Sequence, residues 1–425
     1  MLDIKYIREN TDLVKQGIKN KNYDPQVVDR VLEKDTARRD LIAKTEEIRA
    51  KRNELNEKLK NGRDEELIKE SVKLKKELDD LHPQLKQIEE EYNSLMLQVP
   101  GIPLPEVPIG KDENDNKVVK VHGTKKEFDF TPKSHIELGQ DLDILDIERG
   151  SKIAGFRGYF LKNEGVLLQF ALMQYTLKKF IEHGYTPVVP PMILKKRAFV
   201  NSGHFPWGER ETYKFEAGED DGNEMYLAGT AEVPLVSYYQ DEVLSEKDLP
   251  IRMIGYSPCY RKEAGSYGKD TKGVYRVHEF VKTEQVVLCK NDLDESIKLH
   301  DEMLSLTEEI AQELDLPYRV LLMCSGDMGE PQAKKYDLEA WMPGRGNWGE
   351  LASDSIMLDF QSRRANIRYR DEKNQMQYVH MLNNTASNSP RWLVAILENY
   401  QQKDGSVKIP AALVPYVGKD EIRRA

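Results

Sequence analysis

Two arginines and two glutamates in one stretch of the chain carry the charges that chemistry on a phosphate group requires. Arg261 and Arg276 stand at the ends of a glycine-rich loop, between runs typical of antiparallel strands. Glu263 and Glu284 belong to the same hairpin, so we expect their carboxylates to face one space. Arginine binds phosphate oxygens bidentately and stays charged when desolvated. The loop glycines are Gly265, Gly268 and Gly273. The hairpin predicts a polyphosphate site beside a site for a cationic group, and the alternative is an ordinary charged surface hairpin.

A second group of polar residues suits an amino acid. Thr230 and Glu232 lie two residues apart in a turn, so their hydroxyl and carboxylate are close together. Together they can accept the α-ammonium group of an amino acid. The alternative is that Thr230 caps the N-terminus of a helix. The two roles are compatible, because a cap at residue 230 leaves Glu232 able to point into a site.

Two further segments suit a metal ion and an anion. Glu350 and Ser353 follow a strand-like run at residues 336–343 and carry the oxygen ligands that Mg²⁺ uses when it also holds substrate phosphates. The alternative for Glu350 is a solvated carboxylate in a loop. Arg391 precedes an apolar run typical of a helix. An arginine at that position can bind an anion together with the positive helix end.

The composition limits the classes of protein that fit. The chain has 425 residues, 39% hydrophobic and 32% charged, with a formal net charge of −10, so any nucleic acid must meet a local basic face. Its three cysteines form no close-spaced pair, which disfavours a disulfide framework or a zinc site. No apolar run reaches the roughly 18 residues of a membrane span, and the first residues lack the apolar core of a secretory signal. A cytoplasmic enzyme is therefore expected.

The first hundred residues predict a helical arm. Apolar residues between Leu67 and Leu95 alternate in steps of four and three, a heptad seam typical of coiled coils. A less regular series with the same period lies at residues 31–59. A turn at residues 61–64 separates the two and offers an N-cap for the second helix. Two such helices form an antiparallel hairpin roughly 50 Å long, and Pro83 is expected to bend or locally break the second one.

Basic residues gather on the first helix of the arm near its turn. The ordinary interpretation is a solvated helix face, and the functional one is a face that binds the RNA backbone. These residues are Arg38, Arg39, Lys44, Arg49, Lys51, Arg52, Lys58, Lys60 and Arg63.

The rest of the chain predicts an α+β domain. A proline-rich segment at residues 99–108 ends the arm, since it cannot continue a helix. Short strands, helices and turns follow, without the repeated βαβ units or glycine motifs of a Rossmann or P-loop site. A long helix is expected at residues 161–182, ending at a Gly184 cap and followed by an extended segment that contains Pro191.

These segments resemble, in order and spacing, the bacterial-type seryl-tRNA synthetases, which are class II aminoacyl-tRNA synthetases. Residues 259–284 resemble motif 2, the helix and the segment with Pro191 resemble motif 1, and residues 383–391 resemble motif 3. The resemblance covers nearly the whole chain. It implies an N-terminal tRNA-binding domain at residues 1–104 with an arm at about 28–97. It also implies a catalytic domain at residues 105–425 with a central antiparallel sheet flanked by helices.

The resemblance also implies an activity. ATP and L-serine react to give seryl-adenylate and pyrophosphate, and the seryl group then passes to the 3′-terminal adenosine of tRNA(Ser). The sequence leaves open whether tRNA(Sec) is also served. The implied partners are Mg²⁺, tRNA(Ser) bound through the arm, and a second copy of the chain bound through the motif 1 helix and strand.

The implied nucleotide site has defined roles. Arg261 holds the α-phosphate and the serine carboxylate, Glu263 contacts the adenine amino group, and Phe280 and Arg391 stack on the adenine. Arg391 also reaches the γ-phosphate, and Arg276 helps to hold the nucleotide, so the implied catalytic residues are Arg261, Arg276 and Arg391. The implied ATP-binding residues are Arg261, Lys262, Glu263, Val277, Phe280, Glu350, Leu351, Ala352, Ser353 and Arg391, of which Glu350 and Ser353 would ligate Mg²⁺.

The implied serine site reads both ends of the amino acid. Thr230 and Glu232 would bind its ammonium group, and Glu284 and Thr385 its hydroxyl. The implied serine-binding residues are Thr230, Ala231, Glu232, Arg261, Glu284, Asn383 and Thr385.

Two departures from the family pattern affect these expectations. The segment before Arg391 has none of the usual motif 3 glycines, so the resemblance leaves the backbone of that loop open, with one torsion fixed by Pro390. Asp354 is an added acidic residue and is expected to alter the surroundings of the metal ion.

Two other functions fit part of the chain. The first is an amino-acid activator that loads a carrier protein, but relatives of that kind lack the arm. The second is a coiled-coil scaffold with a degenerate synthetase domain, which the retained charged residues of the three motifs oppose.

Overall fold

The structure is a computed structural model that describes residues 1–60, 62, 64–215, 224–264 and 272–424. Two of the loop glycines, Gly265 and Gly268, and the turn residues Asn61 and Arg63 lie outside these residues. The chain divides into two compact units, Met1–Pro100 and Gly101–Ala425. Among the described residues, no helix has the length and apolar character needed to cross a membrane.

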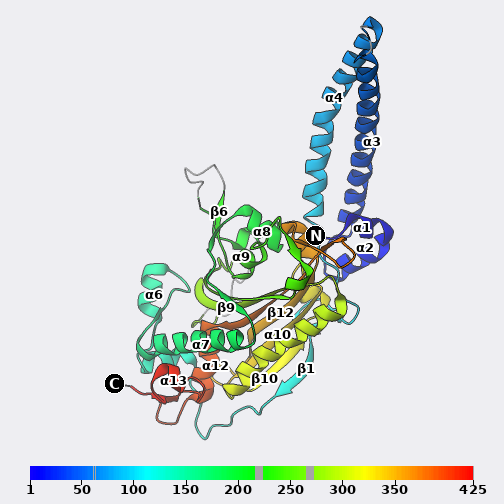
Figure 1. The fold of residues 1–425 in the computed structure, drawn as a ribbon. Helices are drawn as coiled ribbons and strands as arrows, with labels where there is room; N and C mark the ends of the chain where they lie inside the picture. Colours follow the sequence, from blue (N-terminus) through cyan, green and yellow to red (C-terminus); the bar gives the residue numbers. More distant parts are fainter. Residues whose placement is uncertain (61, 63, 216–223, 265–271, 425) are drawn as a thin grey trace. The chain divides into compact units, whose positions relative to one another are not determined.

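The first unit is helical. A small bundle of α1 (Ile4–Glu9) and α2 (Thr11–Asn20) precedes α3 (Gln26–Lys60) and α4 (Glu65–Met96), which form the expected antiparallel arm (Figure 1). Asp64 caps α4, because its carboxylate accepts hydrogen bonds from the first backbone N–H groups of that helix.

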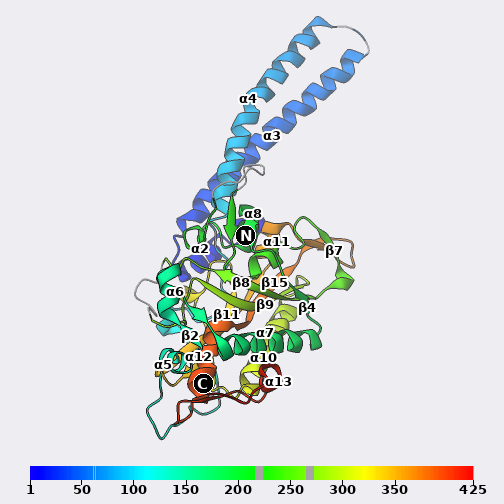
Figure 2. The same cartoon turned by 90° about the vertical axis from the view of Figure 1, so that its left-hand side faces the viewer.

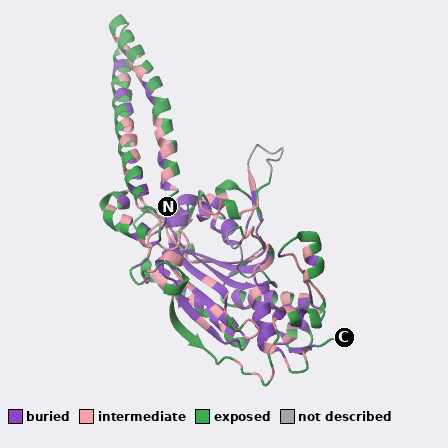
Figure 3. Cartoon of the chain, turned by 180° about the vertical axis from the view of Figure 1, so that it is seen from behind, coloured by how far each residue is buried: buried purple, intermediate pink, exposed green. Residues whose placement is uncertain are grey.

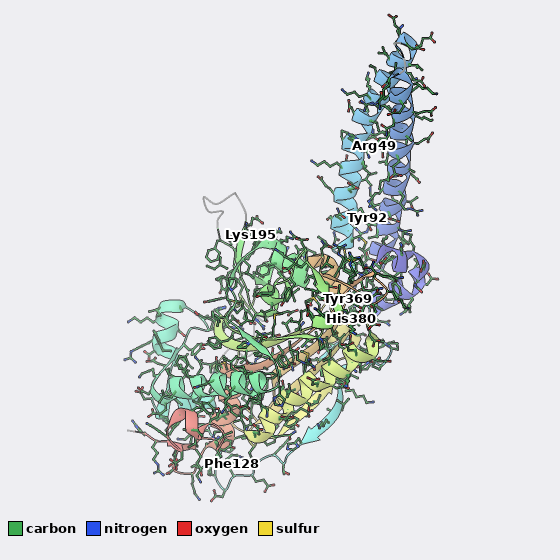
Figure 4. All side chains as sticks on the ribbon, in the orientation of Figure 1. Arg49, Tyr92, Phe128, Lys195, Tyr369 and His380 are labelled. Carbon is green, nitrogen blue, oxygen red and sulfur yellow. The ribbon has the colours of Figure 1, made fainter. Side chains whose placement is uncertain are left out.

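The heptad seam predicted for the arm is confirmed. Leu78 and Leu81 of α4 pack against Ile48 of α3 in one buried cluster, and Tyr92 is buried further along the same face. Arg38 lies on this seam without being apolar, and its guanidinium sits 5.0 Å from the centre of the Tyr92 ring, which Figure 4 labels. The cation–π contact lets a charged residue occupy a seam position.

Of the bend or local break expected at Pro83, the break is absent. Helix α4 continues through Pro83, which is exposed and lies off the seam. The ring therefore needs no room between the helices, and water can satisfy the carbonyl group that proline leaves without a donor.

The basic face of the arm is interleaved with acidic residues. Lys51 pairs with Glu47 at 2.6 Å and Lys58 with Glu54 at 2.7 Å, and all four side chains are more than half exposed. Arg49, labelled in Figure 4, lies 3.2 Å from the Nε2 atom of His82 on the other helix. Exposed pairs of this kind stabilise a fold very little, so these cations stay available to another partner.

The second unit is built on an eight-stranded sheet in the order β1-β10-β11-β12-β15-β9-β8-β4. Neighbouring strands are antiparallel except β4 and β8, which confirms the predicted α+β fold (Figure 2). The strands are β1 (Lys117–His122), β4 (Thr186–Val188), β8 (Ile251–Tyr260), β9 (Glu279–Cys289), β10 (Tyr318–Leu322), β11 (Lys334–Met342), β12 (Asn347–Leu358) and β15 (His380–Asn388).

Three long helices cover one face of this sheet: α7 (Asn163–Glu182), α10 (Leu293–Glu313) and α12 (Ser389–Tyr400). Helix α7 begins two residues later than predicted, and Gly184 takes the expected left-handed conformation with φ at 81°. The strands between the layers are mostly buried, as Figure 3 shows.

The other face carries short elements that enclose the candidate site. Helices α8 (Lys196–Ser202), α9 (Glu232–Val236) and α11 (Phe360–Ala365) lie there with the two-stranded sheet of β5 (Ile193–Lys195) and β6 (Met225–Leu227) (Figures 1 and 2). The remaining elements are η1 (Glu113–Asp115), α5 (His135–Asp141), β2 (Leu145–Asp146), α6 (Ile147–Ala154), β3 (Phe160–Leu161), η2 (Glu209–Glu211), β7 (Val243–Ser245), η3 (Glu246–Asp248), η4 (Ser325–Asp327), β13 (Arg368–Arg370), β14 (Met376–Tyr378), β16 (Val407–Lys408), α13 (Val414–Val417) and β17 (Glu421–Ile422).

Candidate active site

A small cavity, open to solvent, gathers residues of motif 2, β12 and motif 3. It lies between β8, β9, β12 and β15 and the start of α12. The residues named from the sequence that line it are Arg261, Glu263, Arg276, Val277, Phe280, Glu350, Thr385 and Arg391. Segments separated by more than a hundred residues therefore supply one site.

Arg261 enters the cavity directly after β8. Its backbone N–H donates to the His278 carbonyl at 2.9 Å, and the His278 ring lies 2.9 Å from the Arg261 carbonyl, so β9 holds both sides of this residue. The side-chain Nε donates to the Gly229 carbonyl at 3.2 Å, and the guanidinium lies 5.3 Å from the centre of the Phe280 ring. The head group is thus oriented before any substrate arrives.

Arg391 enters the same cavity from the first turn of α12. The backbone before it, which the sequence left open, is regular: β15 runs to Asn388, whose side chain accepts a hydrogen bond from the Arg391 N–H at 3.2 Å. Pro390 stands in the first helical turn, where a missing N–H costs nothing. The segment without glycine therefore forms a capped strand-to-helix junction.

Arg391 and Glu350 form an ion pair of 3.1 Å in the cavity. Burial acts to lower the pKa of Arg391, but the Glu350 carboxylate outweighs it and raises that pKa. Burial likewise acts to raise the pKa of Glu350, whereas Arg391 and Lys335 together hold it below its usual value. Both groups are therefore charged at neutral pH, so Glu350 is a strand carboxylate in an ion pair and not the solvated loop residue of the alternative.

A β-bulge brings Glu350 and Ser353 to one face of β12. Residues three apart in a regular strand face opposite sides, but Leu351 has no partner in the ladder with β11, which reverses the alternation. Ser353 then lies opposite Asp337, a buried residue that the sequence did not single out. Burial raises the pKa of Asp337 to about 7, although the neighbouring Lys335 opposes this shift.

Glu350 and Ser353 can supply only part of the coordination shell of a Mg²⁺ ion. Among the described residues, no group of three His, Cys, Asp or Glu side chains is placed to hold a metal ion. Glu350 and Ser353 supply two oxygens on one face, which suits an ion that takes its other ligands from substrate phosphates and water.

The expected effect of Asp354 on the metal surroundings is wrong. Asp354 is fully buried on the opposite face of β12, where its carboxylate lies 3.3 Å from the Nε2 atom of His300 in α10. Strand alternation beyond the bulge turns it away from Glu350 and Ser353.

A cluster of buried polar side chains, called the second pocket below, adjoins the cavity at Thr385. The Thr385 hydroxyl donates to Glu284 at 3.2 Å, as the pairing of β15 with β9 allows. Lys282 also lies here: its ammonium forms a very short contact with Glu284, and it donates to Thr230 at 2.6 Å. The sequence argument missed Lys282, although its position two residues before Glu284 on a strand places both on one face.

Glu232 completes this pocket. Its Oε1 atom accepts hydrogen bonds from Gln361 at 2.7 Å and from Asn383 at 2.9 Å, and its N–H donates to the Thr230 hydroxyl at 3.3 Å. The N-cap of α9 is Ala231 and has no side-chain cap, so the alternative interpretation of Thr230 as the capping residue is not confirmed, while Glu232 points into the pocket. Burial raises the pKa of Glu232 against the opposing effect of Gln361, and burial also raises the pKa of Glu284 against that of Lys282.

Some expected residues do not line the cavity. The side chains of Ala231, Leu351 and Ala352 are buried in the hydrophobic core, so only their backbone can contact a substrate. The Lys262 ammonium lies 5.7 Å from the centre of the Tyr213 ring. Gln361 is a pocket residue that the sequence argument missed, because helix α11 carries no recognisable motif.

The two units match known families. Residues 213–400 match the class II tRNA synthetase core domain (G, H, P, S and T), and residues 1–103 match the seryl-tRNA synthetase N-terminal domain. With its antiparallel sheet, the second unit has the fold of a class II aminoacyl-tRNA synthetase.

Full-length relatives identify the family. The serine–tRNA ligase of Dictyoglomus turgidum is 43% identical, over 100% of this chain and 99% of the relative. The seryl-tRNA synthetase of Pyrococcus horikoshii, solved with ATP, is 38% identical with a TM-score of 0.92 over 100% of both chains. The cytoplasmic serine–tRNA ligase of Naegleria fowleri, solved with AMP, is 33% identical with a TM-score of 0.89 over 100% of this chain and 99% of that one. This chain belongs to the seryl-tRNA synthetases, a family of ATP-dependent aminoacyl-tRNA ligases.

Proposed function

We propose that this protein activates L-serine with ATP and transfers the seryl group to the 3′-terminal adenosine of tRNA(Ser). The observation that carries the proposal is the joint placement of two guanidinium groups, Arg261 and Arg391, in one cavity beside the Glu284–Thr385 pair. The two guanidinium groups can neutralise the charge of a bent triphosphate, and the Glu284–Thr385 pair can bind a hydroxyl group.

In the activation step, serine carboxylate attacks the α-phosphorus of ATP and pyrophosphate leaves. Arg261 binds the α-phosphate and the incoming carboxylate, so it holds the two reacting groups in line. Phe280 and Arg391 hold the adenine between them, while Arg276 and the backbone at Val277 support the nucleotide. The reaction needs alignment and charge neutralisation more than it needs an acid or a base.

The donor set of β12 supports a Mg²⁺ ion at the phosphates. Glu350 and Ser353 would hold it, with Asp337 behind Ser353. The ion would supply charge neutralisation at the phosphate oxygens. The Glu350–Arg391 ion pair would exchange for contacts with the nucleotide.

The second pocket supports selection of serine. Glu284 and Thr385 would bind the serine hydroxyl, and Thr230 with Glu232 would bind its ammonium group, with Asn383 held beside Glu232. Without the substrate hydroxyl, this buried carboxylate loses a hydrogen bond that it needs, so alanine and glycine bind poorly.

Three wider assignments belong to the same proposal. The exposed cations of α3 support binding of tRNA(Ser) through the arm. A homodimer through α7 and the strand after it is supported by large apolar side chains on that surface, among them Phe170 at 56% exposed and Val189 at 77%. A cytoplasmic location follows from the reaction, since the tRNA substrate is there.

The direct test is pyrophosphate exchange with each of the twenty amino acids, followed by charging of tRNA(Ser) and tRNA(Sec). We expect serine alone to support rapid exchange and tRNA(Ser) to accept the label. Exchange with another amino acid at a comparable rate would contradict the serine assignment. Exchange with serine but transfer only to a carrier protein would favour the activator function instead.

A further inference from the structure

A buried arginine outside the three sequence motifs binds the carboxylate of Glu263. The Nη1 atom of Arg157 lies 3.4 Å from Oε2 of Glu263, and the two side chains are only 4% and 9% exposed. Arg276 binds the same oxygen at 2.9 Å, but its side chain is 28% exposed. Glu263 thus sits between one guanidinium from its own hairpin and another from the segment that joins α6 to β3.

Both members of the Arg157–Glu263 pair have left-handed backbones. The φ angle is 69° at Arg157 and 54° at Glu263, a region that side chains other than those of glycine, asparagine and aspartate rarely occupy. Such conformations persist only where the surrounding structure fixes them, and they concentrate at functional sites. An ordinary surface ion pair would not require a left-handed backbone conformation at both of its residues.

The segment that carries Arg157 is held by close backbone packing. A Cβ atom at Gly150 of α6 would come within 2.3 Å of the Tyr159 backbone, and one at Gly158 would come within 2.7 Å of the Gly150 carbonyl. Helix α6 therefore supports the backbone directly beside Arg157. A rigid support is what an arginine needs in order to hold another side chain in one orientation.

Arg157 also stands between two cavities. Glu263 lines the candidate ATP cavity, whereas Arg157 lines a neighbouring one, and Phe280 lines both. The Arg157 guanidinium thus contacts Glu263 from the side of the neighbouring cavity.

We propose that Arg157 is a positioning residue for base selection: it holds the Glu263 carboxylate oriented toward the amino group of adenine. The inference rests on the proposed contact between Glu263 and adenine. Arginine suits this role because it keeps its charge when buried and binds carboxylates in a fixed geometry, whereas lysine would keep the charge and lose the fork.

The test compares ATP with purine riboside triphosphate, which lacks the exocyclic amino group, by calorimetric binding and by the KM for the nucleotide in pyrophosphate exchange. Wild type should prefer ATP by roughly 10- to 100-fold, the usual effect of one hydrogen bond to a charged group. Arg157→Ala should reduce this preference to within about three-fold while the KM for serine stays unchanged. Arg157→Lys should lie between them. Arg149→Ala removes an exposed arginine of the neighbouring helix α6 and should behave as wild type.

The possible outcomes distinguish failure of the Arg157 positioning role from failure of the proposed ligase function. A weaker affinity of Arg157→Ala for both nucleotides, with the wild-type preference retained, would overturn the positioning role. Arg157→Lys serves the same test if Arg157→Ala fails to fold. Wild type without any preference would overturn both the adenine contact of Glu263 and the inference, while serine-dependent exchange would leave the ligase function intact.

Discussion

The arm and the catalytic unit use charge in opposite ways. In the arm, Lys51 and Glu47 pair with side chains 60% and 65% exposed. In the catalytic unit, Lys282 and Glu284 pair with side chains 5% and 3% exposed. An exposed pair is weak and screened by salt, so it can yield to another polyanion at little cost. A buried pair is held only while each member keeps a partner, which suits a pocket that must distinguish one substrate group from another.

The two regions also differ in the sequence distance of their contacts. The seam of the arm joins two helices that follow each other in the sequence, and Ile48 of the first helix packs with Leu78 of the second. The serine pocket joins residues 101 positions apart, Glu284 and Thr385. The arm can therefore change without affecting the pocket, and the predictions below test this independence.

Removal of the arm should have the largest effect. Replacing residues 30–97 with a short glycine–serine linker should abolish tRNA charging, because the chain loses its basic contacts with the RNA backbone. Serine-dependent pyrophosphate exchange should stay within a few-fold of wild type. Charging at the wild-type rate by the shortened chain would refute the role of the arm, and loss of exchange would refute the independence of the two regions.

Loss of one guanidinium should have the next largest effect. Arg261→Ala should lower serine-dependent pyrophosphate exchange by roughly 10²- to 10³-fold, since one charge-stabilising donor at the α-phosphate is removed. Arg319→Ala, which removes an ion pair between β10 and β11 of the same sheet, is the matched control and should change exchange little. An Arg261→Ala exchange rate within a few-fold of wild type is incompatible with the proposed α-phosphate contact.

Replacement of Pro83 should change the stability of the arm alone. Pro83→Ala should stabilise α4 by roughly 1–3 kcal/mol, because alanine restores the backbone donor inside a continuous helix. The measurement is the melting temperature of the full chain, with amide exchange in α4. Lys86→Ala, another exposed position on the helix, should change little. An unchanged melting temperature would mean that the helix accommodates the proline at no cost, and a lower one would contradict the prediction outright.

Asp337 should make the stability of the catalytic unit depend on pH. Its pKa of about 7 exceeds the value of 3.8 for an unperturbed aspartate, so the native state holds a proton that the unfolded chain releases between these values. Stability should therefore fall as pH rises from about 5 to 7. Asp337→Asn should flatten that slope in denaturant titrations. Asp112→Asn is the control: the pKa of Asp112 is lowered by hydrogen bonds from Asn114, so its curve should parallel wild type above pH 5. Parallel curves for Asp337→Asn would contradict the shift.

The arm was predictable because its pattern is local. The heptad series around Leu78 and Leu81 determines which faces meet, and the structure has the same seam. The prediction that failed, a break at Pro83, overlooked that an exposed position leaves the proline ring in solvent.

The site was predictable only in part. Motif resemblance named residues such as Arg261 and Arg391, which the fold brings into one cavity. Asp337 was missed because its place depends on strand register and on the bulge at Leu351, which no spacing in the sequence encodes. Arg157 was missed for a similar reason, since its partner lies more than a hundred residues away.

The central claim is that the pocket beside the two arginines requires a hydroxyl group on the substrate. Its most direct test is calorimetric binding of sulfamoyl analogues of seryl-adenylate and alanyl-adenylate to wild type and to Glu284→Gln. Wild type should bind the seryl analogue roughly 10⁴-fold more tightly, as expected where a site is built around a substrate hydroxyl, and Glu284→Gln should lose most of that preference. Equal affinity of wild type for both analogues, or a Glu284→Gln variant with the full preference, would contradict the account.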